Sequence, residues 1–149
     1  MKRMNPIQPR LRASGGFSLI EVMVVIVIIG LMAGLVGPRI FKRADEAKVK
    51  TTKAQINHLK TSLGLFRLDT GRFPTTEQGL EALRKKPTGI ENWNGPYIEE
   101  ELPMDAWNRP FDYKCPGADG RDFDLMSNGA DGKAGGEGID ADINSWQNK

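Results

Sequence analysis

The sequence predicts an α+β protein in which one long amino-terminal helix, with its first half in a membrane, packs on a small antiparallel sheet. Three observations predict this fold class. An uncharged run extends from Val22 to Pro38, and with residues 17–21 it reaches about the 20 residues that a helix needs to cross a bilayer. Apolar residues then continue at helical spacing to Phe66. Two short segments of alternating apolar residues follow, separated by a turn, and such alternation is typical of strands.

A basic leader precedes the apolar run. Residues 1–16 contain no acid and four basic residues, Lys2, Arg3, Arg10 and Arg12. Positively charged segments stay on the cytoplasmic side of a membrane, so a single crossing would place the carboxy-terminal part outside the cytoplasm. An ordinary secretory signal is cut after its apolar run, next to small residues. Ala33, Gly34 and Gly37 keep that alternative open, whereas Gly16 stands before the run.

One acid, Glu21, lies at the start of the apolar segment. A carboxylate at the centre of a membrane helix costs about 2.5–3.5 kcal/mol, and less near an end, so Glu21 requires a partner. Cleavage after Gly16 would give Phe17 a positively charged α-amine about one helical turn from Glu21. Pairing within one subunit and pairing between neighbours both fit this spacing. The alternative is that Glu21 interacts with the helix dipole or reaches the lipid headgroups.

A known processing signal matches residues 16–21, whose sequence is Gly-Phe-Ser-Leu-Ile-Glu. This segment resembles the class III signal of type IV pilins and type II secretion pseudopilins. In that family a prepilin peptidase cuts after the glycine and methylates the new amino-terminal phenylalanine, and the glutamate guides subunits into a helical filament. The resemblance therefore implies processing at Gly16 and Phe17 and an assembly role for Glu21.

The helical pattern and the resemblance together predict the domain organisation. The predicted parts are a cleaved leader at 1–16, a transmembrane and assembly helix at 17–41, its amphipathic continuation at 42–69, and a periplasmic globular part at 70–149. A continuous helix from Phe17 to Asp69 would be about 80 Å long. Pro38 lacks a backbone donor, which predicts a kink or local melting. Thr70 and Gly71 predict the end of the helix.

The amphipathic half of the helix is predicted to share a core with the sheet. The apolar residues expected to face the sheet are Ile56, Leu59, Leu63 and Phe66. The strands are expected at residues 111–115 and 123–126, antiparallel and joined by a loop that contains Pro116 and Gly117. So small a sheet buries little area alone, so it needs the helix.

A short helix is predicted before the sheet. Thr75 and Gln78 stand in capping-box register, and Leu80 and Leu83 supply the apolar side of the helix. The string Pro-Thr-Thr-Glu-Gln-Gly-Leu at residues 74–80 also resembles the major pseudopilins of type II secretion.

Aromatic residues among turn formers are expected in loops over the core. One such segment has the sequence Asp-Ala-Trp-Asn at residues 105–108, whereas the family commonly has Asp-Pro-Trp-Gly. This departure affects the rigidity of the turn, and Trp107 is expected to be a structural anchor.

The carboxy-terminal loop, residues 127–142, is rich in glycine and acids. Ca²⁺ binds about six to eight oxygens from carboxylates and backbone carbonyls, but the spacing here is not that of an EF-hand. Composition alone leaves a flexible surface loop and a calcium site equally open. The loop is similar to the calcium loop of major pseudopilins. This resemblance implies calcium held by Asp131 and Asp142, with Asp140 as a third carboxylate and a carbonyl oxygen near Asn128.

The resemblance covers nearly the whole chain after the leader and implies a structural subunit without enzymatic activity. Major pseudopilins polymerise into the periplasmic pseudopilus of a type II secretion system, which drives export of folded proteins across the outer membrane. The implied partners are further copies of the chain, minor pseudopilins, the prepilin peptidase and an inner-membrane assembly platform. The implied location is the bacterial inner membrane, crossed once, with the amino terminus cytoplasmic and the carboxy-terminal domain periplasmic.

The sequence leaves two other classes of protein open. A type IV pilin for adhesion or motility commonly closes a carboxy-terminal loop with a disulfide, which the single Cys115 cannot form within one chain. A membrane-tethered enzyme would need catalytic groups, and the one histidine, His58, has no recognisable partner. Loss of the leader takes the formal charge from +2 to +2 − 4 = −2, so charge does not indicate nucleic-acid binding.

Overall fold

The computed structural model describes residues 16–147, apart from the side chains of residues 37–39. Helix α1 spans Leu19–Thr70, so it begins two residues later and ends one residue later than predicted. Its backbone stays helical through Pro38, so of the two alternatives expected there, a kink or local melting, melting does not occur. The basic leader residues lie outside the described part of the chain, namely Lys2, Arg3, Arg10 and Arg12.

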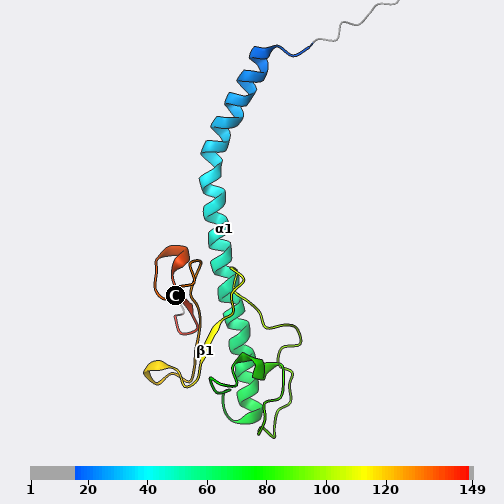
Figure 1. Cartoon of the computed structure of the whole chain (residues 1–149), viewed down its shortest axis with the longest axis vertical. Coiled ribbons are helices and arrows are strands. Elements are labelled where there is room, and N and C mark those ends of the chain that lie inside the picture. Colours follow the sequence, from blue (N-terminus) through cyan, green and yellow to red (C-terminus); the bar gives the residue numbers. More distant parts are fainter. Residues whose placement is uncertain (1–15, 148–149) are drawn as a thin grey trace, which may run out of the picture. The chain divides into compact units, whose positions relative to one another are not determined.

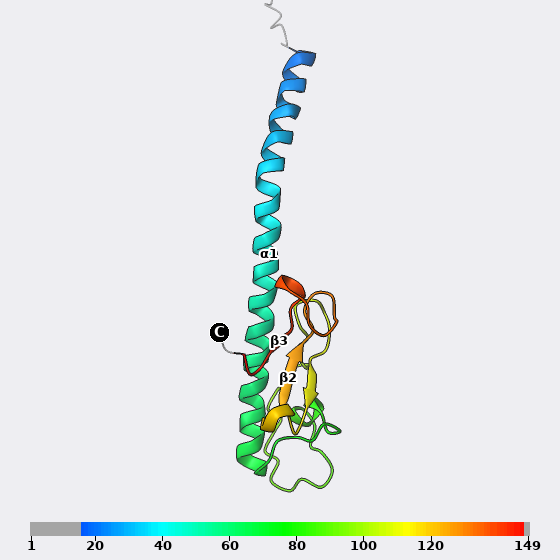
Figure 2. The same ribbon diagram turned by 90° about the vertical axis from the view of Figure 1, so that its left-hand side faces the viewer.

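The chain divides into two units, one ending at Ile40 and the other beginning at Phe41. In the first unit, the described residues are mainly the apolar part of α1. The second, globular unit contains the rest of α1 and everything that follows it. Figures 1 and 2 show the short strands of this unit beside the second half of α1.

A three-stranded antiparallel sheet lies in the described part of the globular unit, with strand order β1-β2-β3. Strands β1 (Asp112–Lys114) and β2 (Asp124–Ser127) confirm the two predicted strands. Strand β3 (Ile143–Asn144) is an addition to the prediction and pairs with the end of β2. Its two residues are too few for an alternating pattern, so only the tertiary pairing reveals it.

One face of α1 forms a core with the sheet and the loops. The predicted core residues of α1 are no more than 2% exposed: Ile56, Leu59, Leu63 and Phe66. The rest of the unit completes the core with Leu80, Ala82, Leu83, Ile90, Ile98, Phe111, Leu125 and Ile143. Since the strands are only two to four residues long, the helix supplies the largest continuous face of this core.

The predicted capping box is present in the structure. The backbone N–H of Thr75 donates to Oε1 of Gln78 (3.0 Å), and the backbone N–H of Gln78 donates to Oγ1 of Thr75 (3.2 Å). The turn ends at Gly79, whose φ of 58° suits glycine. The short 3₁₀ helix η1, Leu80–Leu83, then buries both leucines as predicted.

A tight turn at residues 105–109 connects α1 to the sheet. Asp105 is 5% exposed. Its carboxylate accepts three hydrogen bonds, from the backbone N–H groups of Trp107 and Arg109 (both 2.9 Å) and from the hydroxyl of Ser127 in β2 (2.6 Å). On the other side, the backbone N–H of Ala106 donates to Thr52 of α1 (3.1 Å). Trp107 packs partly buried against the core, which agrees with its expected role as an anchor.

Asn108 explains how this turn tolerates its departure from the family pattern. Its φ is 62°, in the left-handed region that favours glycine. Asparagine enters this region more readily than other residues with a side chain. The backbone N–H of Asn108 donates to the carbonyl of Asp105 (3.1 Å) and closes the turn.

The effect of replacing Asn108 on stability should therefore depend on how easily the new residue adopts a positive φ. Asn108→Val should lower the free energy of unfolding by about 1–2 kcal/mol, because a β-branched residue is strained at positive φ. Asn108→Gly should preserve stability or raise it slightly. Denaturant unfolding of both variants measures the difference, and a valine variant as stable as the unchanged chain would contradict this explanation.

Candidate functional site

The start of α1 carries the predicted processing and assembly residues. Gly16, Phe17 and Ser18 precede the helix, and Phe17 is 82% exposed. The carbonyl oxygen of Ser18 accepts the backbone N–H groups of Glu21 (3.0 Å) and Val22 (3.2 Å). Glu21 thus lies in the first turn of α1, where the positive end of the helix dipole favours a carboxylate. This position fits both the dipole interpretation and pairing with an amine on Phe17.

The first unit exposes a continuous apolar surface. Every large apolar side chain from Leu19 to Val36 is exposed. Within residues 16–147, α1 is the one helix whose length and composition suffice to cross a membrane. Soluble proteins rarely expose an apolar surface of this extent, so it requires lipid or the apolar surface of another chain.

Glycines allow the carboxy-terminal loop to fold tightly on itself. The backbone oxygen of Asp140 packs against Gly129 and Gly136, where an added Cβ would lie 2.6 Å and 2.5 Å from it. Both glycines have positive φ, 60° and 89°. Across the loop, the backbone N–H of Ala130 donates to the carbonyl of Ile139 (2.9 Å). Side chains at the two glycines would prevent this close approach.

The predicted metal-binding residues lie in this loop with different surroundings. One carboxylate oxygen of Asp142 accepts the backbone N–H of Gly135 (2.9 Å), and the other is buried without a hydrogen-bond partner. Asp131 is exposed, and its carboxylate accepts a backbone N–H two residues later (3.0 Å). The side-chain amide of Asn128 donates to Asp112 (2.8 Å). Among the residues that the structure describes, no three His, Cys, Asp or Glu side chains converge.

Arg109 holds this loop in place, a role that the sequence analysis missed. Its guanidinium donates to the backbone carbonyls of Gly129 and Ala130, both at 2.8 Å. It also packs on Gly132, where an added Cβ would lie 2.7 Å from a guanidinium nitrogen. Asp105 fixes the backbone of Arg109 through the turn. The sequence does contain a signal for this role, because the acid Asp105 and the base Arg109 stand four residues apart. The segment was interpreted only as a turn.

Polar and aromatic contacts fix the residues after β3. Lys60 of α1 donates to the backbone carbonyl of Ser145 (2.8 Å). The guanidinium of Arg121 stacks on the ring of Trp146, 4.3 Å from its centre, and Nε donates to Asp124 (2.7 Å). This hydrogen bond from Arg121 lowers the pKa of Asp124 below its ordinary value of 3.8, against the opposing effect of burial.

A long helix that is apolar and exposed at its start and that packs further on against a small antiparallel sheet is the architecture expected of a pilin-type subunit. Residues 39–146 match the family described as type II secretion system protein G, and residues 11–37 match the prokaryotic N-terminal methylation motif. The second match contains Gly16, Phe17 and Glu21.

Relatives and a solved structure agree with this assignment. The chain is 49% identical to the type II secretion system core protein G of Pseudomonas aeruginosa over 92% of this chain and 98% of that protein. It is 42% identical to the protein of the same name from Vibrio cholerae, over 92% and 94%. The crystal structure of the major pseudopilin from the type 2 secretion system of enterohaemorrhagic Escherichia coli matches with a TM-score of 0.60 at 36% identity, over 70% of this chain and 90% of that one. The chain belongs to the type II secretion system protein G family.

The pKa of Asp124 predicts part of the acid sensitivity of the globular unit. Because the folded-state pKa lies below the unfolded value, the unfolded chain binds protons more readily, and this stabilisation is lost as the pH falls through and below about 4. Asp124→Asn should therefore reduce the fall in melting temperature between about pH 5 and pH 2. Glu81→Gln, at an exposed carboxylate on η1, is the control. An unchanged pH profile in Asp124→Asn would contradict the assignment.

Proposed function

We propose that this chain is the major pseudopilin that polymerises into the periplasmic pseudopilus of a type II secretion system and thereby drives export of folded proteins across the outer membrane. The role is structural and needs no catalytic group. The observation that carries the proposal is the exposed apolar part of α1 with one acid in its first turn. That surface can be buried in lipid before assembly and against other subunits afterwards.

Processing precedes assembly in this proposal. The prepilin peptidase cuts between Gly16 and Phe17 and methylates the new amine. Both residues lie outside the helix, and Phe17 is exposed, which supports access by a protease. The chain crosses the inner membrane once, with residues 1–16 cytoplasmic before cleavage and the globular unit periplasmic. Its partners are further copies of itself, minor pseudopilins and the inner-membrane assembly platform.

Glu21 supplies the test of this function. Glu21→Ala should leave membrane insertion and cleavage intact but reduce filament yield by about tenfold or more, because an uncompensated amine would then enter an apolar filament interior. Membrane fractionation, amino-terminal sequencing and electron microscopy of sheared filaments measure the three steps. Glu91→Ala makes the same change at an exposed carboxylate of the globular unit and should assemble normally. Filaments from Glu21→Ala at the level of the unchanged chain would overturn the assembly role.

We also propose that the carboxy-terminal loop binds calcium. The residues fit this ion because Asp142 has one buried carboxylate oxygen without a partner, in a loop folded around backbone carbonyls. Calcium takes about six to eight oxygen ligands, which carboxylates and carbonyls supply together. Asp142 is the leading candidate, and Asp131, Asp140 and the region of Asn128 are the remaining ones. A bound ion would add positive charge among acidic groups and stabilise the folded loop.

The calcium proposal predicts a selective rise in melting temperature. For the full chain in detergent, calcium at about 100 times its Kd adds about 2.7 kcal/mol to the free energy of unfolding, whereas magnesium should add little. Asp142→Ala and Asp131→Ala should remove most of this rise, and Glu81→Ala should retain it. If the aspartate variants lose equal stability with calcium and with a chelator, the loop is damaged rather than deprived of an ion, and the proposal is wrong.

A further inference from the structure

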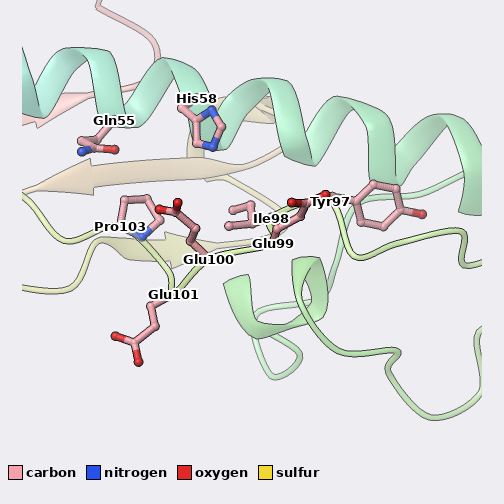
Figure 3. Close-up of a pocket in the computed structure, with 8 residues that line it drawn as sticks. All are labelled: Gln55, His58, Tyr97, Ile98, Glu99, Glu100, Glu101 and Pro103. Carbon is pink, nitrogen blue, oxygen red and sulfur yellow. The ribbon is translucent and has the colours of Figure 1, made fainter.

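An acidic groove lies on one flank of the second half of α1. Gln55 and His58 form its helical wall, and residues 97–103 form the other wall, around a volume of about 520 Å³ (Figure 3). The second wall contains three consecutive exposed glutamates, Glu99, Glu100 and Glu101. In Figure 3 the side chain of Glu100 points toward the helix and that of Glu101 points away from it.

No described residue forms an ion pair with any of the three glutamates. The ion pairs between described residues involve Arg67 and Arg121 with aspartates elsewhere in the globular unit, and none reaches residues 99–101. Adjacent carboxylates repel one another, so an external cation would lower the electrostatic energy of this groove.

A basic surface lies on the opposite flank of α1. An α-helix turns by about 100° per residue. Viewed along the axis of α1, Lys42, Lys50 and Lys53 therefore lie roughly 110° to 170° away from the direction midway between Gln55 and His58. All three lysines are exposed and none forms an ion pair with another described residue. Glu46 shares their flank as a single acid, and Lys48 lies on the groove side. The buried face of α1 lies between these two flanks.

From Ala47 to Leu68, the outward side of the helix carries no permanent charge between the flanks, and Arg43 precedes this stretch on the same side. Its exposed positions at three- and four-residue spacing are Ala47, Thr51, Ala54, His58, Thr61, Leu65 and Leu68. Most of these side chains are small, so a second helix can approach α1 closely along this side. Each subunit therefore presents an acidic flank and a basic flank on the two sides of a surface suited to helix packing.

We propose that the acidic groove of one subunit receives the lysine flank of the next copy, with Glu99 and Glu100 facing Lys50 and Lys53. This inference rests on the proposed filament function and specifies its lateral contact. The two surfaces differ, so the contact is heterologous, and a repeated heterologous contact that does not close generates a helical polymer. One exposed ion pair contributes little, but opposed clusters direct the register of association and disfavour wrong pairings.

A charge exchange tests the contact in the full chain, expressed with its secretion system in cells that lack their own copy. One variant carries Glu99→Lys with Glu100→Lys, a second carries Lys50→Glu with Lys53→Glu, and a third combines all four changes. Each reversal alone should lower the yield of sheared filaments by about tenfold or more, and the combination should restore it to within about threefold of the unchanged chain. Glu81→Lys with Glu91→Lys is the control, with the same charge change outside the groove.

The outcomes separate this contact from the filament function itself. Melting temperatures in detergent show whether each variant folds. Restored assembly in the combined variant would show independently that the four substitutions together allow folding. The contact is overturned if either reversal assembles as well as the unchanged chain, or if the combined variant assembles no better than the single reversals. Failure of the unchanged chain to form any filament would instead overturn the proposed function and, with it, this contact.

Discussion

The globular unit depends on the burial of one face of α1. Strands of two to four residues cannot enclose a core by themselves, so the helix must supply most of it. Leu59, Leu63 and Phe66 are 0% exposed, and Leu125 and Ile143 cover them from the sheet. The same helix carries the exposed apolar segment of the first unit. One continuous element thus provides both the main surface of the core and the surface that we assign to the membrane and the filament.

A polar framework then positions the carboxy-terminal loop on this core. Asp105 ties the turn to Ser127, while Thr52 ties it to the helix. Arg109 extends from the turn to two loop carbonyls at 2.8 Å. Buried polar groups stabilise a structure when their hydrogen bonds are satisfied, and Asp105 meets this condition. Asp142 leaves one buried oxygen unsatisfied, and the proposed calcium site rests on this oxygen.

Features governed by local pattern could be predicted from the sequence. Helix α1 follows from spacing, and the capping box of Thr75 and Gln78 follows from two residues three apart. The predictions fell short where partners are distant in the chain, as with β3 and the bond between Asp105 and Ser127. Composition identified the acidic, glycine-rich loop but could not show which oxygens lack partners, because the burial of Asp142 depends on how the backbone folds. The processing motif at residues 16–21 is short and local, which is why sequence alone could assign it.

Strand β3 has a consequence for the order of folding. Among the strands of residues 16–147 it is synthesised after the other two, it pairs with β2, and Ile143 belongs to the core. Ser145 and Trp146, immediately after it, are bound by Lys60 and Arg121. The globular unit can therefore complete its native contacts only after nearly all of these residues have emerged from the ribosome. A chain interrupted before this strand would leave core leucines uncovered, a state that proteases and chaperones recognise, so the fold itself distinguishes finished subunits from unfinished ones.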